Sequence, residues 1–174
     1  MEIDITLQKR ICNDSNFKKY FIENLENIIN QSSGYNAWII GKLCQDKDVR
    51  KVIIDNLDIV YSKMTNIGEF AIYMTKSEIR QNIDKFFKSG NIDRDILTLF
   101  DVLIDDKVFS NDRIVELFAN NIEQIYKGIG LCGIYDIMDK IPHFTMYQEN
   151  NLSIKKIDEL LVNNMEEIRN TKFR

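Results

Sequence analysis

Proline, histidine and cysteine are scarce in this chain. Its 174 residues include one proline, Pro142, one histidine, His143, and three cysteines. A single histidine excludes His-rich metal sites and relays between two histidines. The cysteines, Cys12, Cys44 and Cys132, are odd in number and have no CxxC spacing, so neither a closed disulfide framework nor a zinc ribbon is indicated. We expect reduced thiols and therefore a cytoplasmic protein.

Long apolar runs and an excess of positive charge are missing as well. No apolar run approaches the roughly eighteen residues that suggest a membrane span, and the first residues, MEIDITLQKRIC, do not read as an export signal. We therefore expect no membrane association. The formal net charge is −4. Because non-specific nucleic-acid binding depends on lysine and arginine neutralising phosphates, nucleic acid is not the expected partner.

The composition favours helices. Seven glycines and one proline suit helices joined by short turns better than a strand-rich sandwich. Apolar residues make up 44% and charged residues 29%, within the range of chains that fold around a core. The length suits one domain. The sequence therefore predicts a single all-α domain over residues 1–174.

The chain also repeats itself. Residues 10–30, RICNDSNFKKYFIENLENIIN, align without a gap with residues 42–62, KLCQDKDVRKVIIDNLDIVYS, which begin 32 positions later. The second half of this unit returns three more times. Each copy has an asparagine followed by Leu, Ile or Met and then an acid. The five asparagines are Asn24, Asn56, Asn82, Asn121 and Asn164.

The spacing around each asparagine is helical. Apolar residues fall mostly seven, four and three positions before it and one and four positions after it, the period of a helix with one buried face. We call this segment the B helix and the shorter apolar segment before it the A helix. The expected A helices cover 3–12, 36–44, 67–74, 93–104 and 129–140. Ten helices in five antiparallel hairpins result, with repeats at 1–31, 32–64, 65–89, 90–127 and 128–174.

Several helix ends carry their own signals. Thr75 and Glu78 have the spacing of a capping box, in which two side chains satisfy the first amides of a helix. Other junctions carry residues that can cap a helix start or glycines that can end a helix. These are Asp48, Ser110, Ser153, Gly34, Gly90 and Gly128.

The B helices resemble HEAT repeats. In that family the second helix has an Asp, a Val-Arg pair, small or apolar residues three and six positions later, and a Leu. The second repeat matches with Asp46, Val49, Arg50, Ile53, Asn56, Leu57 and Val60. The arginine is clear only at Arg50, and the proline common in the family's A helices is absent. Resemblance to HEAT-like or armadillo-like proteins implies a right-handed α-solenoid that binds partners along its B helices, and it carries over no catalytic residue.

The repeated asparagine has two interpretations. It lies at the margin of the apolar face, so successive copies would form a column. In the first interpretation each amide satisfies polar groups at a joint within or between repeats, as buried polar groups require. In the second, which the armadillo resemblance implies, the column grips an extended peptide backbone. The marginal position favours the first.

An acid follows each asparagine by two positions and lies almost opposite the apolar face. With neighbouring acids it forms a candidate acidic ridge on the B helices. The members are Glu23, Glu26, Asp55, Asp58, Asp84, Glu123 and Glu166. The simplest interpretation is a solvated face. The alternative is a docking strip for a basic protein, where opposite charge would raise the association rate.

No coherent catalytic or cofactor motif is present. Gly128, Gly130 and Gly133 have the spacing of a dinucleotide fingerprint, but a predicted helix precedes them where the fingerprint needs a strand. We expect no cofactor and no metal. The sequence favours a non-enzymatic protein-binding module, such as a small acidic inhibitor of the immunity or anti-defence type in a bacterium or phage, or an adaptor. The alternatives are a nucleic-acid-processing enzyme on a HEAT-like scaffold and a self-assembling scaffold protein.

Overall fold

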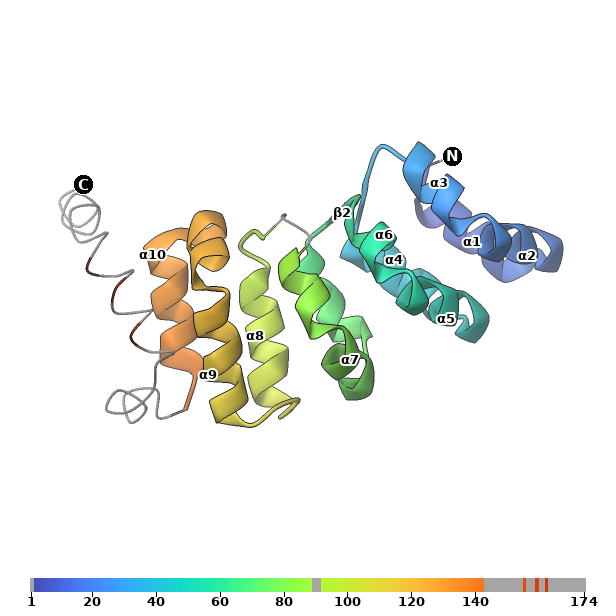
Figure 1. Ribbon diagram of the computed structural model, residues 1–174. Coiled ribbons are helices and arrows are strands. Elements are labelled where there is room, and N and C mark those ends of the chain that lie inside the picture. Colours follow the sequence, from blue (N-terminus) through green and yellow to red (C-terminus); the bar gives the residue numbers. More distant parts are fainter. Residues whose placement is uncertain (1, 89–91, 143–154, 156–158, 160–161, 163–174) are drawn as a thin grey trace. The chain divides into compact units, whose positions relative to one another are not determined.

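The computed structural model describes residues 2–88 and 92–142 and the single positions 155, 159 and 162 (Figure 1). In this part of the chain every element except two short strands is helical, so the predicted all-α class is confirmed. The chain divides into two compact units, Met1–Asn91 and Ile92–Arg174. Their boundary lies close to the predicted junction between the third and fourth repeats.

A and B helices alternate along the first unit. The A helices are α1 (Ile5–Asn13), α4 (Ala37–Leu43) and the 3-10 helix η1 (Ile67–Tyr73). The first two B helices are each divided at the asparagine, into α2 (Ser15–Glu23) and α3 (Leu25–Gln31), and into α5 (Lys47–Asp55) and α6 (Leu57–Tyr61). The third, α7 (Lys76–Lys88), is continuous. The expected A and B segments of this unit are helical, but the two breaks were not predicted.

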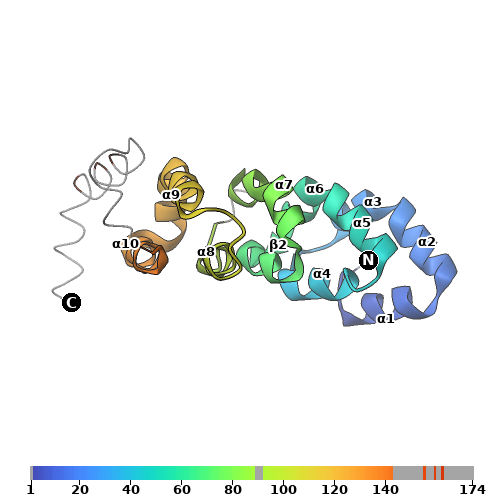
Figure 2. The same ribbon diagram turned by 90° about the horizontal axis from the view of Figure 1, so that it is seen from below.

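Like helices are neighbours in the first unit. Helix α4 contacts both α1 and η1, α5 contacts α2, and α6 contacts α3 and α7. In Figure 2 the A helices α1 and α4 lie along one side of the unit and the B helices along the other. Before the second and third A helices, strands β1 (Tyr35–Asn36) and β2 (Met64–Thr65) pair in parallel. Corresponding segments of consecutive repeats therefore lie side by side.

The first two repeats also match at their helix starts. Asp4 and Asn36 cap α1 and α4, each accepting a hydrogen bond from the backbone N–H three residues later, at 2.9 and 3.1 Å. Asp14 and Asp46 cap α2 and α5 in the same way, at 3.0 and 3.2 Å. Both pairs are 32 residues apart, which is the offset of the sequence repeat. The repetition in sequence is thus a repetition of local structure.

The apolar positions of the repeat form the core. Phe21 and Ile53, three residues before the asparagine, are fully buried, and so are Leu57 and Val60 after it. The counterparts of Leu57 and Val60 in the first repeat, Leu25 and Ile28, are at most 5% exposed. Burying one such side chain stabilises the fold by about 1.5–3 kcal/mol. The helical period therefore identified the buried face correctly.

The second unit contains α8 (Ile96–Asp105), α9 (Asn111–Asn120) and α10 (Ile122–Lys140). Helix α8 contacts both α9 and α10. Helix α10 has a non-helical residue, Gly130, with φ of 64°. The expected A helix at 129–140 is therefore the part of α10 that follows this break.

The glycine that interrupts α10 was assigned wrongly. We expected a positive φ at Gly128, but it occurs at Gly130, with φ of 64° and ψ of −172°. Gly128 has another role, because a Cβ at this position would collide with the carbonyl oxygen of Ile92. The break is therefore at Gly130, whereas Gly128 permits a close approach of two backbones.

The predicted helix starts are partly confirmed. The capping box is present: the Thr75 N–H donates to Glu78 Oε2 at 2.6 Å, and the Glu78 N–H donates to Thr75 Oγ1 at 3.2 Å. Ser110 caps α9. Asp48 lies beside the cap of α5, in the first turn of the helix, and Asp46 is the N-cap itself. Gly34 has a positive φ of 130°, and Ser153 and Gly90 lie outside the described residues.

Candidate partner-binding surface

The repeated asparagine makes the same hydrogen bond in four repeats. Its side-chain Nδ2 donates to the backbone carbonyl four residues earlier. The distances are 2.9 Å from Asn24 to Tyr20, 2.8 Å from Asn56 to Val52, 3.0 Å from Asn82 to Glu78 and 2.8 Å from Asn121 to Leu117. Asn164 lies outside the described residues. The amide thus bonds within its own helix.

This bond accompanies a break in the helix at three of the four positions. The ψ angles of Asn24, Asn56 and Asn121 are 18°, 31° and 11°, far from the helical value of about −42°. Such a residue interrupts the backbone ladder, and its amide supplies a donor for a carbonyl near the break. Asn82 makes the same bond inside the continuous α7. The geometry favours a structural role, and the gripping of a peptide backbone stays a prediction.

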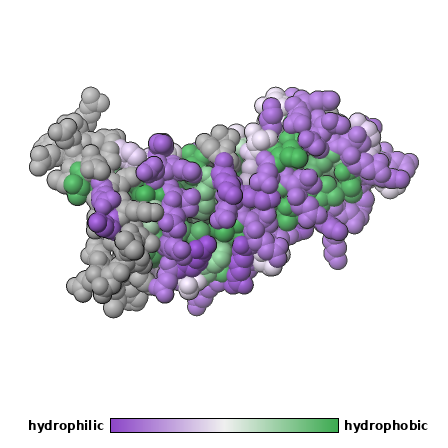
Figure 3. Space-filling view, viewed as in Figure 1, coloured by the Kyte–Doolittle hydropathy of each residue, from purple (hydrophilic) through white to green (hydrophobic). Residues whose placement is uncertain are grey.

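The acids of the candidate ridge are exposed. Figure 3 shows hydrophilic side chains over most of the visible face of the first unit. The exposed members are Glu23, Glu26, Asp55, Asp58, Asp84 and Glu123, and Glu166 lies outside the described residues. In the first unit, Glu26, Asp58 and Asp84 come from α3, α6 and α7, which are successive neighbours. We call the five members in that unit, Glu23, Glu26, Asp55, Asp58 and Asp84, the acidic row.

The break at the asparagine gives the acid a local role. Glu26, Asp58 and Glu123 each lie in the first turn of the helix that begins after the break. A negative charge there interacts favourably with the partial positive charge of the helix N-terminus. Helix stability alone can therefore account for an acid at this position. To act as a binding surface, these carboxylates must also be exposed to solvent, and all three are.

Two members of the acidic row have basic neighbours. Lys85 Nζ of α7 lies 2.9 Å from Asp58 Oδ2 of α6, and Lys19 Nζ lies 3.8 Å from Glu23 Oε1 in α2. The side chains of Asp58 and Glu23 remain 70% and 58% exposed. Exposed pairs of this kind contribute about 0–1 kcal/mol, so a cationic partner could displace the lysines at little cost.

A different set of charges joins consecutive repeats. Lys18 and Arg50 both lie six residues before the repeated asparagine. Lys18 Nζ lies 3.0 Å from Asp46 Oδ2. Arg50 donates two hydrogen bonds to the Glu78 carboxylate, one from Nε at 2.9 Å and one from Nη2. The carboxylates of Asp46 and Glu78 also accept hydrogen bonds from backbone N–H groups at the start of the next B helix. Each cation therefore ties one B helix to the start of the following one.

The pKa values of the two carboxylates in these contacts, Asp46 and Glu78, are lowered. Partial burial alone would raise the pKa of Glu78, but donors from Arg50 and Thr75 together lower it below its ordinary value. Burial acts in the same way on the pKa of Asp46, and hydrogen bonds from Lys18 and from two backbone amides lower it overall. Both carboxylates are therefore ionised at neutral pH, and the ties between repeats are intact there.

The repeat pattern missed a further group of exposed acids, in the second unit. Residues 1–91 contain 13 Lys and Arg and 12 Asp and Glu, a net charge of +1, whereas residues 92–174 contain 10 and 15, a net charge of −5. Asp105 and Asp106 end α8 and Asp112 lies at the start of α9, all exposed. The signal was the composition of this turn, DDKVFSND, which lies outside the aligned positions.

The remaining motifs do not form a cofactor or metal site among the residues that the structure describes. The GIGLCG segment lies inside α10, so it lacks the strand that a dinucleotide fingerprint needs. Within residues 2–88 and 92–142, no group of three or more His, Cys, Asp or Glu could hold a metal ion. In the same residues no helix combines the length and apolarity needed to cross a bilayer. His143 lies outside the described residues.

Comparisons with models of known protein families, with curated proteins and with solved structures find no match to this chain. The resemblance to HEAT-like and armadillo-like repeats stays a prediction that rests on the residues of the repeat.

Proposed function

We propose that this chain is a non-enzymatic protein-binding module that presents the exposed acids of its B helices to a basic protein. Its scaffold in this proposal is an α-solenoid of HEAT-like hairpins. The side-by-side placement of like helices in the first unit supports such a stack. The ties from Lys18 to Asp46 and from Arg50 to Glu78 support it further, because they join one repeat to the next.

One observation carries the proposal: the same position of successive B helices places an exposed acid on neighbouring helices. Glu26, Asp58 and Asp84 occupy that position on α3, α6 and α7. Opposite charges on a partner would be attracted over a distance of about 8–10 Å and would orient it before contact. The chain's net charge of −4 disfavours a polyphosphate partner for the same reason. An inhibitor or adaptor of a basic protein fits this surface best.

A cationic peptide tests the proposal. The row variant carries Glu26→Lys, Asp55→Lys and Asp84→Lys, and its affinity for a fluorescent octalysine peptide is compared with that of the wild type. At about 0.5 kcal/mol per reversed charge, binding should weaken about tenfold. Circular dichroism verifies that the variant is folded.

The matched control reverses three exposed acids outside the acidic row: Asp93→Lys, Asp136→Lys and Asp139→Lys. It changes the net charge equally, so it should lose less than about threefold in affinity if the position of the charges matters. Equal losses in the two variants would show that only net charge attracts the peptide, and the proposal would be wrong. Binding of duplex DNA as tight as that of octalysine would support the nucleic-acid alternative instead.

A further inference from the structure

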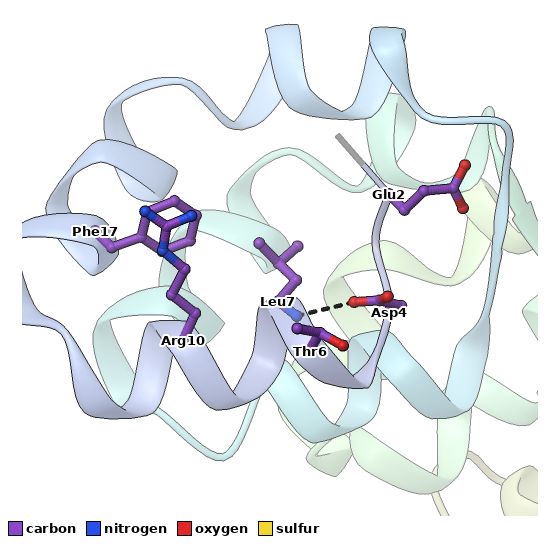
Figure 4. A pocket seen from close by; sticks show the side chains of 6 residues that line it. All are labelled: Glu2, Asp4, Thr6, Leu7, Arg10 and Phe17. Atoms are coloured by element: carbon purple, nitrogen blue, oxygen red, sulfur yellow. Dashed lines mark hydrogen bonds between the residues drawn. The ribbon is translucent and has the colours of Figure 1, made fainter.

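A hollow of about 250 Å³ opens on the first hairpin, apart from the acidic row (Figure 4). It is lined by Glu2, Asp4, Thr6, Leu7, Arg10 and Phe17. Leu7 and Phe17 are only 5% and 9% exposed, so they form an apolar floor anchored in the core. The guanidinium of Arg10 lies over the ring of Phe17, with Cζ 3.9 Å from the ring centroid.

The second repeat pairs a cation with an aromatic ring at the corresponding sequence positions. Thr6 and Arg10 correspond to Trp38 and Lys42, at the 32-residue offset that also relates the helix caps. Lys42 Nζ lies over the indole of Trp38, 5.8 Å from the ring. The second repeat thus supplies both an aromatic ring and the cation above it. The first repeat supplies the cation but has a threonine at the position of the ring.

Negative charge borders the hollow on the side away from Arg10. In Figure 4, Glu2 and Asp4 lie on one side of Leu7, and Arg10 and Phe17 lie on the other. Asp4 is the N-cap of α1, six residues before Arg10, which corresponds to about 9 Å along a helix. The hollow therefore offers an apolar floor and a cation that can face a ring, with carboxylates a short distance away.

We propose that this hollow binds an aromatic side chain of a partner peptide that carries a positive charge next to the ring. The ring packs on Leu7 and Phe17 beside the Arg10 guanidinium, where cation–π attraction adds to apolar burial. The adjacent charge of the peptide pairs with Asp4 and Glu2. This site does not depend on the acidic row, so either proposal can fail alone.

Three small probes separate the ring from the charge. L-Tryptophanamide has an indole and an ammonium, N-acetyl-L-tryptophanamide has the indole alone, and L-lysinamide has charge without a ring. We expect L-tryptophanamide to shift the backbone amide NMR signals of Thr6, Leu7 and Phe17 in the full chain, with a dissociation constant of about 1 mM. The acetylated probe should bind about two- to fivefold more weakly, because it lacks the charge. L-Lysinamide should bind at least about tenfold more weakly, because it lacks the ring.

Three substitutions locate the binding. Thr6→Trp introduces the residue of the second repeat and should abolish L-tryptophanamide binding, whereas Thr6→Val should retain it. Arg10→Gln should weaken it about two- to fivefold. Undiminished binding to a folded Thr6→Trp variant, or shifts centred on residues outside the hollow, would overturn the proposal. If Thr6→Trp does not fold, Arg10→Gln decides, since an unchanged affinity for that variant contradicts the role of the guanidinium.

Discussion

The contact between Arg50 and Glu78 should contribute measurably to stability because it joins two repeats. The two side chains are 25% and 20% exposed, and they make two hydrogen bonds to each other. Arg50 Nη2 also donates to the carbonyl of Tyr73 at 3.0 Å. Exposed ion pairs contribute up to about 1 kcal/mol, and hydrogen bonds to charged groups about 1.5–3 kcal/mol. We expect a coupling energy of about 1–2 kcal/mol.

A double-mutant cycle measures this coupling. Arg50→Met keeps much of the apolar stem but removes the charge and the donors to Glu78 and Tyr73, and Glu78→Gln removes the charge but keeps an acceptor for the capping bonds of Thr75. The free energy of unfolding of the four proteins is obtained from urea titrations followed by circular dichroism. The Glu78→Gln and Arg50→Met variants should each lose about 1–2 kcal/mol.

The matched control is the pair Lys19 and Glu23, which lies within α2 at 3.8 Å with side chains 76% and 58% exposed. Its cycle, with Lys19→Met and Glu23→Gln, should give about 0.3–0.5 kcal/mol. A coupling between Arg50 and Glu78 no larger than the control value would refute the reasoning that this contact ties the repeats together.

Three further predictions concern pH, the asparagine and a packed glycine. The pKa values of Asp46 and Glu78 are lowered in the folded state, so their stabilisation is complete above the unfolded values of 3.8 and 4.5 and is lost as the pH falls below them. The free energy of unfolding should therefore decrease between about pH 5 and pH 3, and this decrease should be smaller in Glu78→Gln. Asn56→Ala removes the donor to Val52 and should cost about 1 kcal/mol in urea unfolding, whereas the exposed Gln81→Ala should change stability by less than about 0.5 kcal/mol. Gly41→Ala places a Cβ against the ring of Tyr73 and should cost about 1–3 kcal/mol, seen as a lower melting temperature.

The sequence predicted the helices and the buried face because both depend on local periodicity. The apolar residues around Asn24 and Asn56 keep their helical spacing across the break, so the pattern could not show that the helix is interrupted there. The capping box at Thr75 and Glu78 was predictable because both partners lie within one turn.

Features that depend on distant residues were not predictable in the same way. The close approach at Gly128 involves the backbone of Ile92, more than thirty residues away in sequence. Arg50 was recognised by its resemblance to a family pattern, but its partner Glu78 lies 28 residues further along the chain. The exposure of the acids was predicted from the helical period, whereas their neighbours Lys85 and Lys19 became evident only from the structure.

The salt dependence of octalysine binding tests most directly whether the acidic row is a binding surface. Dissociation constants are measured for the wild type, the row variant and the control variant at about 50 and 200 mM salt, which shortens the range of charge interactions substantially. We predict that added salt weakens binding strongly for the wild type and the control variant, and only slightly for the row variant. The same salt dependence in all three proteins would contradict the assignment of partner binding to Glu26, Asp55 and Asp84.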